Sequence, residues 1–241
     1  MSASGPLAGR RGLVTGGTRG IGAAIAQRLL ADGAEVIVTG TTPEGAAPAG
    51  CGYRPVDFTD GDATAAFAQD VAGLELDILV NNAGINKIGP FEEIDPDDFD
   101  RIQQVNVRAP FLLCRAVLPS MRVRRWGRIV NVCSIFGTIS KELRGSYSTS
   151  KFALDGMTAA LAAEVAADGI LANCVSPGFI DTELTRSILG EEGIAELTAR
   201  VPARRLGSPE EIAALVAWLA GPENTYLTGQ NVVIDGGFSR I

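Results

Sequence analysis

Short apolar runs rich in β-branched residues alternate with longer segments of helical spacing along nearly the whole chain. Seven runs are expected to be strands: Gly12–Thr15, Glu35–Thr39, Tyr53–Val56, Asp77–Asn81, Arg128–Cys133, Leu171–Val175 and Asn231–Ile234. Most of these runs are continuously apolar, which is typical of strands that are covered on both faces. Because helical segments separate them, the pattern predicts an α/β protein with a three-layer, doubly wound Rossmann fold and a seven-stranded parallel sheet.

The segments between these runs predict helices. Their expected bounds are Ile21–Leu30, Asp62–Ala72, Pro96–Ser120 with a bend near Pro110, Tyr147–Asp168 and Pro209–Leu219. Neither an internal repeat nor a linker interrupts the 241 residues. The sequence therefore predicts a single domain over residues 1–241, long enough to bury about three quarters of the surface of the unfolded chain.

Composition excludes several classes of function. The chain has no histidine, which removes Ser-His-Asp and Cys-His mechanisms and most zinc sites, so no metal site is predicted. A net charge of −7 argues against nucleic acid as a partner. The basic cluster Arg122, Arg124, Arg125 and Arg128 is interpreted as a solvated turn before a strand.

Nothing in the chain predicts export or membrane insertion. The first 15 residues lack the apolar core of a signal peptide, and no apolar run approaches the ~18 residues that span a bilayer. The four cysteines show no Cys-x-x-Cys spacing and are expected to be buried thiols in a reducing compartment. We therefore expect a cytoplasmic enzyme or binding protein without a membrane partner.

A glycine-rich turn connects the first expected strand to the first expected helix. Glycines at positions 16, 20 and 22 permit a tight turn and let backbone N–H groups approach a pyrophosphate at the helix N-terminus. The spacing is Gly-x-x-x-Gly-x-Gly rather than the general Gly-x-Gly-x-x-Gly fingerprint. The turn predicts a dinucleotide site, and the residues expected to contact the cofactor there are Gly16, Thr18, Arg19, Gly20, Ile21 and Gly22.

The end of the second expected strand bears on which nicotinamide cofactor binds. An acidic residue there would bind the ribose 2′-hydroxyl of NAD, whereas an arginine accommodates the 2′-phosphate of NADP. No acid stands at the strand end, and Arg19 lies in the glycine turn nearby. Hydroxyls from Thr39 or Thr41 would add neutral hydrogen bonds. The sequence favours NADP(H) over NAD(H), although Glu44 follows closely enough to leave NAD(H) open.

Tyr147 and Lys151 lie four residues apart near the start of an expected helix, 13 residues after Ser134. A helix places such positions on one face, where the lysine ammonium would favour the phenolate form of the tyrosine. A phenol tuned in this way can act as a general acid or base. Taken alone, the pair could equally be a surface lysine beside a half-buried tyrosine.

Six motifs in order, covering essentially the full length, resemble the single-domain short-chain dehydrogenases/reductases. They are the Thr15–Gly22 turn, Asn81-Asn82-Ala83-Gly84, Asn106 between two valines, Ser134, Tyr147-x-x-x-Lys151 and Pro177-Gly178. The resemblance implies a catalytic tetrad of Asn106, Ser134, Tyr147 and Lys151. It also implies cofactor contacts from Asp57 and Phe58 near the adenine, from Asn82, Ala83 and Gly84, from Tyr147, Lys151, Pro177 and Gly178, and from Ile180 and Thr182 near the nicotinamide.

The same resemblance implies an activity. The chain is similar to the 3-oxoacyl-carrier-protein reductase branch, which uses NADPH, so we expect an oxidoreductase that reversibly reduces a ketone or 3-oxo carbonyl to a secondary alcohol. Tyr147 would be the general acid, Ser134 would hold the substrate oxygen, and Asn106 would anchor a water that relays protons to Lys151. The alternatives are a non-catalytic dinucleotide-binding sensor or scaffold and an NADH-dependent alcohol dehydrogenase. A homotetramer is implied, with Val232–Gly237 near a subunit contact.

The substrate is less constrained. Lys141, Glu142 and Arg144 would flank the pocket mouth opposite Asn86 and Lys87, which favours a polar or anionic carbonyl compound, although a solvated loop is an equally good interpretation. Residues 180–203 are expected to form a mobile helical lid that excludes water. Arg124 and Arg125 could bind an acyl carrier protein, but Asp168-Gly169 stands where carrier-using relatives tend to have a basic residue. A small ketone or ketoester is therefore expected.

Overall fold

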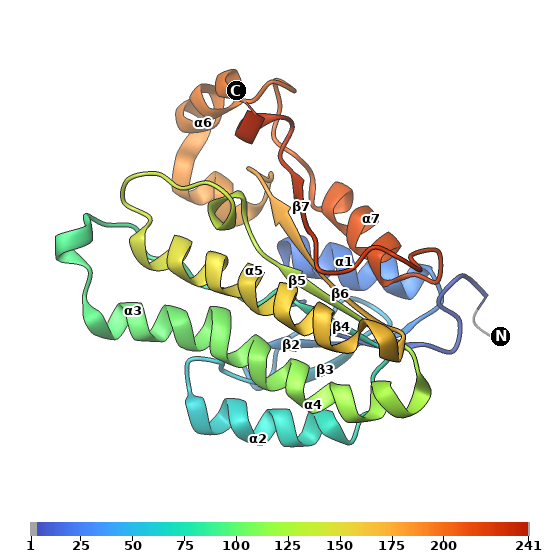
Figure 1. Ribbon diagram of the computed structural model, residues 1–241. Coiled ribbons are helices and arrows are strands. Elements are labelled where there is room, and N and C mark those ends of the chain that lie inside the picture. The colour runs from blue at the N-terminus through green and yellow to red at the C-terminus, as the bar shows by residue number, and fades with distance from the viewer. Residues whose placement is uncertain (1–3, 241) are drawn as a thin grey trace.

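The computed structural model describes residues 4–240, apart from the side chains of Leu184 and Ile188. Its sheet has seven parallel strands (Figure 1). They are β1 (Arg11–Val14), β2 (Glu35–Gly40), β3 (Gly52–Pro55), β4 (Ile78–Asn81), β5 (Gly127–Val132), β6 (Ile170–Pro177) and β7 (Asn231–Ile234). The expected Rossmann fold is confirmed, and the strand bounds differ from the expected ones by one or two residues at most.

The order of the strands creates a switch point in the middle of the sheet. The order is β3-β2-β1-β4-β5-β6-β7, so the chain moves outward from β1 to β3 and then places β4 on the other side of β1. Val14 in β1 is paired with Val38 in β2 and with Val80 in β4. Ligands of open α/β sheets bind at the carboxyl ends of the strands where the order reverses, which is where the loops after β1 and β4 meet.

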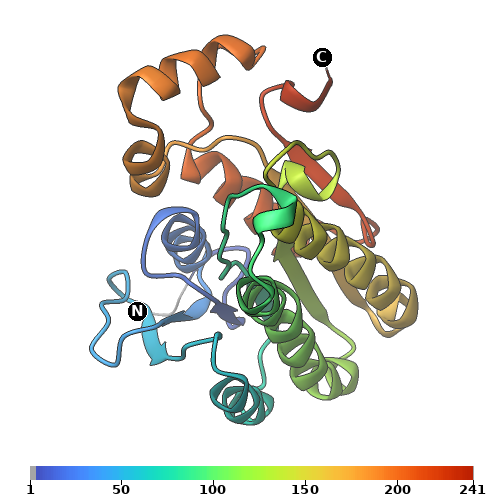
Figure 2. The same ribbon diagram turned by 90° about the vertical axis from the view of Figure 1, so that its left-hand side faces the viewer.

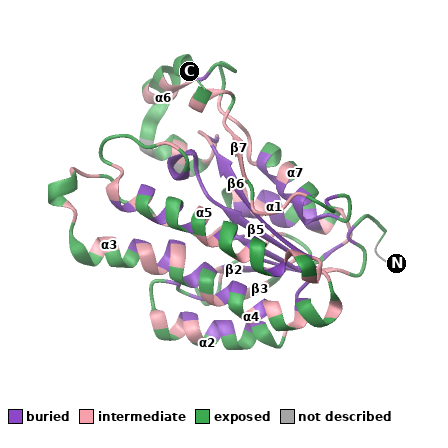
Figure 3. Cartoon of the chain, in the orientation of Figure 1, coloured by how far each residue is buried: buried purple, intermediate pink, exposed green. Residues whose placement is uncertain are grey.

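Helices cover both faces of the sheet (Figures 1 and 2). On one face lie α1 (Gly20–Ala31) and α7 (Pro209–Ala220), whose apolar residues form a core with the strands. On the other lie α2 (Gly61–Ala72), α4 (Ala109–Arg124) and α5 (Gly145–Val165), which form a second core. Strands β4, β5 and β6 are buried along their full length (Figure 3), as their continuous apolar pattern predicts.

The prediction of one helix over Pro96–Ser120 is wrong. The segment forms α3 (Pro96–Gln103), a wide π-helical turn η2 (Gln104–Arg108) and then α4. Pro110 has no N–H to donate to the carbonyl oxygen of Asn106, as a regular helix would require. The irregularity therefore begins one turn before the proline, and it contains Asn106. Wide turns of this kind occur frequently at functional sites.

The segment expected to be a lid forms α6 (Glu183–Arg200), beyond the carboxyl ends of the strands (Figure 1). Gly190 interrupts this helix with φ 64° and ψ −179°. After α6, the Ala203 N–H donates to the Gly236 carbonyl oxygen at 3.1 Å, which ties the end of α6 to the C-terminal segment after β7. No helix among residues 4–240 combines the length and apolarity needed to cross a bilayer.

The arginine cluster before β5 differs from the solvated turn that its sequence suggests. Arg122 and Arg125 pair with Asp168, and Arg124 pairs with Asp77. Arg128 is buried, and its guanidinium donates to three backbone carbonyl oxygens. Burial lowers the pKa of Arg128 to about 10. The interpretation is wrong for Arg128 because backbone carbonyl groups replace water around it.

Candidate active site

The glycine turn after β1 is too tightly packed to accept larger residues. Gly16 and Gly20 have φ angles of 63° and 55°, in the region that favours glycine. A Cβ on Gly22 would lie 2.3 Å from the Gly16 carbonyl oxygen and 2.5 Å from Nδ2 of Asn82. The turn therefore needs glycine at all three positions, for backbone conformation at two and for space at the third.

Side chains from two strand ends hold this turn in place. Thr15 Oγ1 accepts hydrogen bonds from the N–H groups of Asn82 and Ala83, both at 2.9 Å. Asn82 Nδ2 donates to the carbonyl oxygens of Thr15 at 3.0 Å and Gly16 at 3.1 Å. Asn82 thus joins the glycine turn after β1 to the loop after β4, across the switch point of the sheet.

The start of α1 is left open to an anion. No side chain caps it, and its first turn contains no acidic residue, whereas Asp60, Thr182 and Ser208 cap α2, α6 and α7. The first N–H groups of a helix have no partner within the helix and favour negative charge. Together with the glycine turn, this open helix end fits the pyrophosphate of a dinucleotide.

The two threonines expected to contact the adenosine phosphate, at the end of β2, differ in their surroundings. Thr39 is buried, and its Oγ1 accepts a hydrogen bond from the Gly16 N–H at 3.1 Å. Its hydroxyl therefore supports the glycine turn, which leaves the exposed Thr41 for a neutral hydrogen bond to a phosphate. Arg19 is exposed, and within residues 4–240 its guanidinium forms no hydrogen bond or ion pair.

The residues expected near the adenine lie after β3. Asp57 is exposed, and its Oδ1 accepts from the N–H and the hydroxyl of Thr59 at 2.9 and 2.8 Å. Phe58 is buried, and its ring packs edge-on against Phe67 with centroids 6.0 Å apart. The Phe58 side chain is thus part of the core, and only its backbone is left to contact a cofactor.

Lys151 and Tyr147 lie on the first two turns of α5. Lys151 is buried, and its Nζ donates to the Val132 carbonyl oxygen at the end of β5, at 3.0 Å. The same Nζ lies 5.6 Å from the centre of the Tyr147 ring. The half-buried Tyr147 ring also packs edge-on against Phe136, with centroids 6.5 Å apart. The ammonium is therefore fixed between the sheet edge and the phenol.

Asn106 points inward from the wide turn η2. Its Oδ1 accepts from the Ile85 N–H at 2.9 Å, and its Nδ2 donates to the Ile85 carbonyl oxygen at 2.9 Å and to Ser150 Oγ at 3.0 Å. A Cβ placed on Gly84 would lie 3.3 Å from Asn106 Oδ1 and 3.6 Å from Lys151 Nζ. The structure therefore brings Asn106, Lys151 and Gly84 to one point.

Ser134 follows β5 and begins the short helix η3 (Ile135–Gly137). Its Oγ accepts from the Phe136 N–H at 3.2 Å, so the hydroxyl proton is left free to donate. A Cβ on Gly137 would lie 2.7 Å from Cys133 Sγ and 3.0 Å from the Lys151 carbonyl oxygen. This close approach packs η3 against α5 and brings Ser134 to the same side of the sheet as Tyr147.

A buried thiol pair lies beneath these residues. Cys133 Sγ donates to the Lys151 carbonyl oxygen at 3.1 Å, and Cys174 Sγ donates to Thr158 Oγ1 at 3.1 Å. The interaction between the two thiols lowers the pKa of Cys133 to about 7, and the same interaction together with burial raises the pKa of Cys174. All four cysteines are free thiols, and the pair supports the backbone of α5 under the site.

The remaining expected residues lie after β6. Pro177 ends β6, and a Cβ on Gly178 would be 2.7 Å from Asp235 Cα. The Ile180 side chain is buried in the first core, which leaves its backbone for a cofactor contact. Thr182 caps α6, and its Cγ2 would be 3.8 Å from a Cβ on Gly20. The start of α6 therefore lies against the glycine turn.

Several residues at the site were not singled out from the sequence. Phe136 packs edge-on against Phe179, and Phe179 packs against Phe238, with centroids 6.4 and 5.0 Å apart. With Tyr147 they form an aromatic row from α5 to the C-terminal segment. Each lies within two residues of Ser134, Pro177-Gly178 or the Asp235–Gly237 turn, and that proximity is the only signal that could have found them.

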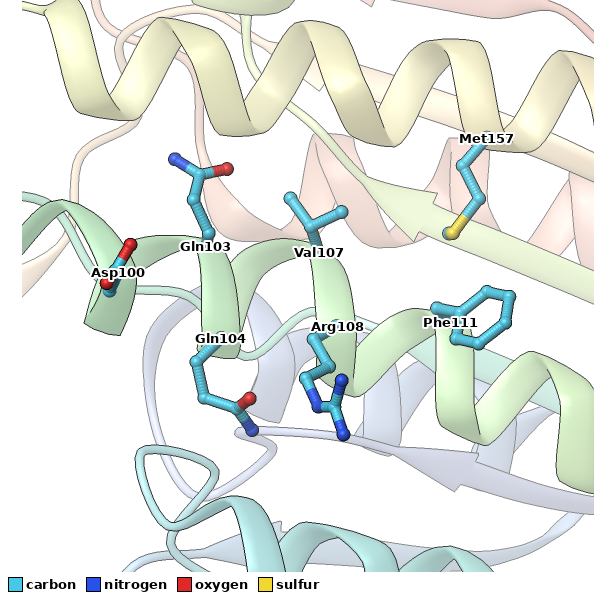
Figure 4. A pocket seen from close by; sticks show the side chains of 7 residues that line it. All are labelled: Asp100, Gln103, Gln104, Val107, Arg108, Phe111 and Met157. Carbon is cyan, nitrogen blue, oxygen red and sulfur yellow. The ribbon is translucent and has the colours of Figure 1, made fainter.

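A groove of about 570 Å³ lies outside this site (Figure 4). Its lining residues come from α3, η2, α4 and α5, and they are Asp100, Gln103, Gln104, Val107, Arg108, Phe111 and Met157. Gln103 and Val107 point toward α5, and Met157 points back from α5 toward α4 (Figure 4). None of the predicted site residues lines it, so the groove belongs to the helical layer rather than to the sheet edge.

The parallel sheet, the glycine turn and the open start of α1 define a Rossmann-fold dinucleotide enzyme. A family model described as Enoyl-(Acyl carrier protein) reductase matches residues 16–239. A 3-oxoacyl-acyl-carrier-protein reductase of Vibrio cholerae is 39% identical over 250 residues, which cover 98% of this chain and 99% of that protein. The chain belongs to the short-chain dehydrogenase/reductase family and is an NAD(P)-dependent oxidoreductase acting on CH–OH groups.

Solved structures agree with this assignment. A gluconate 5-dehydrogenase of Burkholderia cenocepacia, in complex with NADP and tartrate, has a TM-score of 0.89 and 30% identity, over 97% of this chain and 96% of that one. A structure described as a short chain dehydrogenase/reductase family protein has a TM-score of 0.89 and 34% identity, over 99% and 100% of the two chains. The whole chain thus shares the fold of these relatives.

Proposed function

We propose that the protein uses NADPH to reduce a ketone or 3-oxo carbonyl reversibly to a secondary alcohol. The observation that carries this proposal is the Lys151 ammonium, fixed by the Val132 carbonyl oxygen and 5.6 Å from the centre of the Tyr147 ring. A buried cation beside a half-exposed phenol suits a group that gives up and regains a proton. The sequence resemblance and the family membership point to the same chemistry.

The site residues divide the work of the reaction. The glycine turn and the N-terminus of α1 would hold the pyrophosphate of the dinucleotide, which when bound would supply the hydride. Ser134 Oγ, whose proton no acceptor takes among the described residues, donates a hydrogen bond to the substrate oxygen. The Tyr147 hydroxyl gives that oxygen its proton during reduction and takes it back during oxidation. Positioning and fixed charge carry most of the rate enhancement in such a site.

Lys151 and Asn106 form the supporting part of this mechanism. The Lys151 ammonium would stabilise the phenolate that remains after proton transfer and would bind the ribose hydroxyls of the cofactor. Asn106 holds the backbone of Ile85, and its Oδ1 lies close to Gly84 and Lys151. Its proposed role is to anchor a water that would relay protons to Lys151 from solvent.

NADPH is favoured over NADH by an arginine near the glycine turn and by the lack of an acidic residue at the end of β2. Arg19, at the start of α1, is exposed and forms no hydrogen bond or ion pair within residues 4–240, and Thr41, just after β2, is also exposed, so both are available to a 2′-phosphate. The NADP bound to the gluconate 5-dehydrogenase of Burkholderia cenocepacia supports the same choice. The protein is proposed to be one NAD(P)-binding domain in which residues 180–203, including α6, close over the substrate.

The substrate is proposed to be a small ketone or ketoester rather than a carrier-bound acyl group. The relative from Vibrio cholerae is named for a carrier-protein substrate. In this chain, however, Asp168 forms ion pairs with Arg122 at 3.0 Å and with Arg125 at 3.4 Å. The Asp168 carboxylate therefore already neutralises positive charge of these arginines, which an acidic carrier protein would need for binding.

A homotetramer is also proposed, with contacts through the outer faces of α4 and α5. Phe111 and Phe152 are 51% and 46% exposed on these two helices, and Phe111 lines the groove described above. At the edge of the sheet, β7 is half-buried along its length. Light scattering after size-exclusion chromatography tests this assembly. Phe152→Asp is expected to lower the molar mass, and an unchanged mass would count against a contact at α5.

Consumption of NADPH against a panel of ketones, ketoesters and thioesters tests the reaction. We expect the wild-type protein to turn over at least one small carbonyl class, and Tyr147→Phe to lose ~10²–10⁴-fold in turnover while its affinity for NADPH is kept. A cofactor-binding sensor would bind NADPH without consuming it on any member of the panel. Turnover near the wild-type level in Tyr147→Phe would remove the tyrosine from its role.

A further inference from the structure

The positive charges expected around the pocket mouth differ in whether the protein neutralises them. Lys87, in the loop after β4, pairs with Asp98 of α3, and Arg101 pairs with the same carboxylate. Arg144, just before α5, forms no ion pair within residues 4–240. Arg144 is partly buried at the pocket mouth. Among the partly buried charged residues there, it is the one with no carboxylate partner in the described part of the chain.

The guanidinium of Arg144 lies on the aromatic row at the site. Its Cζ is 5.2 Å from the centre of the Phe136 ring. Phe136 is buried, and its N–H donates to Ser134 Oγ while its ring packs against Tyr147. A cation over an aromatic face is attracted to it and is held in a defined place. One ring therefore links Arg144 to both of the residues proposed to bind the reacting oxygen.

The backbone around Arg144 is also fixed. Leu143 has a φ of 66°, and its carbonyl oxygen accepts from the Gly89 N–H at 3.3 Å. A Cβ on Gly145 would lie 2.9 Å from both Phe91 and Ile94. The loop between β4 and α3 thus clamps the residues on either side of Arg144. An arginine in a clamped segment loses less freedom when it binds a ligand than one on a mobile loop.

The environment of Arg144 favours an external anion. Its Nε is buried and has no hydrogen-bond partner in the described part of the chain. Burial lowers the pKa of Arg144, and the nearby Tyr147 opposes this effect. Leaving a charged donor partly desolvated and unpaired costs free energy, and a bound carboxylate would offset that cost with a charge-assisted, two-point hydrogen bond.

We propose that Arg144 binds a carboxylate of the substrate, so that the preferred substrates are short oxo-acids. This assignment rests on the carbonyl reduction proposed above, and among small ketones it places the free oxo-acids ahead of the neutral ketones and ketoesters. Tyr147 lies three residues after Arg144 across the first turn of α5, with Phe136 against both side chains. The carboxylate and the reacting carbonyl are therefore separated by only a few bonds. Arg144 determines specificity and takes no part in hydride or proton transfer.

Matched pairs of acids and esters test the inference. With saturating NADPH, kcat/KM is measured for 3-oxobutanoate and 4-oxopentanoate and for their ethyl esters, in the wild-type protein, Arg144→Gln and Arg144→Lys. We expect the wild-type protein to prefer one acid over its ester. Arg144→Gln should lose about 10–100-fold on that acid, mainly through KM, because a charge-assisted hydrogen bond is lost, and should stay within about threefold on the ester. Arg144→Lys should be intermediate.

The control and a second measurement separate specificity from folding. Arg28→Gln makes the same chemical change at an exposed i, i+4 ion pair in the last turn of α1 and should leave the acid-to-ester ratio unchanged. If Arg144→Gln does not fold, inhibition of ester reduction in the wild-type protein decides: butanoate should compete at least tenfold better than butanamide.

The outcomes distinguish this inference from the reaction on which it depends. Equal kcat/KM for acids and esters in the wild-type protein, or an equal loss on both in Arg144→Gln, would overturn the role of Arg144 and leave the carbonyl reduction standing. Equal inhibition by butanoate and butanamide would overturn it as well. Failure to reduce any acid, ester or neutral ketone would instead contradict the proposed function itself.

Discussion

Asn106 and Ser150 are joined by a buried hydrogen bond of 3.0 Å, from the Asn106 amide to Ser150 Oγ. Ser150 Oγ in turn donates to the Tyr147 carbonyl oxygen at 2.7 Å. The two bonds connect the wide turn η2 to the first turn of α5. The position of Asn106 is therefore coupled to the helix that carries Tyr147 and Lys151, although Ser150 itself reaches no substrate.

Ser150→Ala tests this coupling. The change leaves one donor of Asn106 without its buried acceptor, which is expected to lower the free energy of unfolding by about 1–2 kcal/mol. It should also lower kcat by roughly tenfold, because a misplaced site residue is costly even when it stays present. Thr149→Ala is the control, since the exposed Thr149 hydroxyl bonds, among the described residues, only to the Gly145 carbonyl oxygen. Unchanged stability and kcat in Ser150→Ala would show that Asn106 needs no support from α5.

Gly22→Ala is expected to abolish dinucleotide binding. The added Cβ would lie 2.3 Å from the Gly16 carbonyl oxygen and 2.5 Å from Asn82 Nδ2, so the turn and the bridge to β4 cannot both persist. Gly61→Ala is the matched change at the start of α2, where the Cβ would find only Gln104 Oε1 at 3.9 Å. Calorimetric titration with NADPH should show binding in Gly61→Ala and none in Gly22→Ala. Equal affinities would mean that the turn does not hold the pyrophosphate.

Arg19→Ala is expected to weaken the binding of NADPH far more than the binding of NADH. A guanidinium facing a phosphate contributes a charge-assisted hydrogen bond that a ribose hydroxyl cannot replace, so the dissociation constant for NADPH should rise about 10–100-fold. The constant for NADH should change by less than about threefold. Fluorescence titration with both cofactors provides the measurement. Equal losses for the two would place Arg19 away from the 2′-phosphate.

The contacts of Glu211 at the start of α7 should make a contribution to the free energy of unfolding that depends on pH. The hydrogen bond from Arg205 and the Ser208 N–H lower the pKa of Glu211 from 4.5 to about 2. The carboxylate form of Glu211 is therefore more stable in the folded protein than in the unfolded chain. The resulting gain in the free energy of unfolding is complete above about pH 5 and is lost as the pH falls toward 2. Because the Glu211 side chain is 42% exposed, solvent screening should keep the contribution below about 1 kcal/mol.

Glu211→Gln tests this contribution by denaturant unfolding at several pH values. The wild-type protein should be the more stable of the two at pH 7, and the difference should shrink below about pH 5 and nearly disappear at about pH 2. Glu210→Gln removes a neighbouring, exposed carboxylate in the same first turn and should show a smaller difference. A gap that stays constant from pH 7 to pH 2 would mean that the interaction does not depend on the charge of Glu211.

The sheet could be predicted because burial on both faces leaves a direct trace in the sequence. The continuous apolar runs of β4, β5 and β6 identify central strands, and the helical segments between them require parallel connections. The wide turn η2 could not be predicted in this way. Its position follows from Pro110 together with the bonds between Asn106 and the Ile85 backbone, which is 21 residues away, and a contact of that kind leaves no periodic pattern.

The placement of the site residues followed from a simple rule. Residues that directly follow parallel strands meet at one edge of the sheet, so the Asn82–Gly84 loop and Ser134 had to lie near the glycine turn. What the sequence did not reveal were the partners that fix these residues. Ser150 looks like any small residue on a helix, and Thr39 looks like a surface hydroxyl at a strand end, yet its Oγ1 accepts from the Gly16 N–H.

The π-helical turn η2 contains one residue more than a regular helical turn. The position of Asn106 therefore depends more on the number of residues in this segment than on which residues they are. Each residue of a regular helix turns the chain by about 100°. A deletion of one residue between Gln104 and Arg108 would restore regular winding and rotate everything before the deletion against everything after it. Asn106 would then face away from Ile85, although each side chain around it was kept. Substitutions in this segment can be accommodated one at a time, but insertions and deletions cannot.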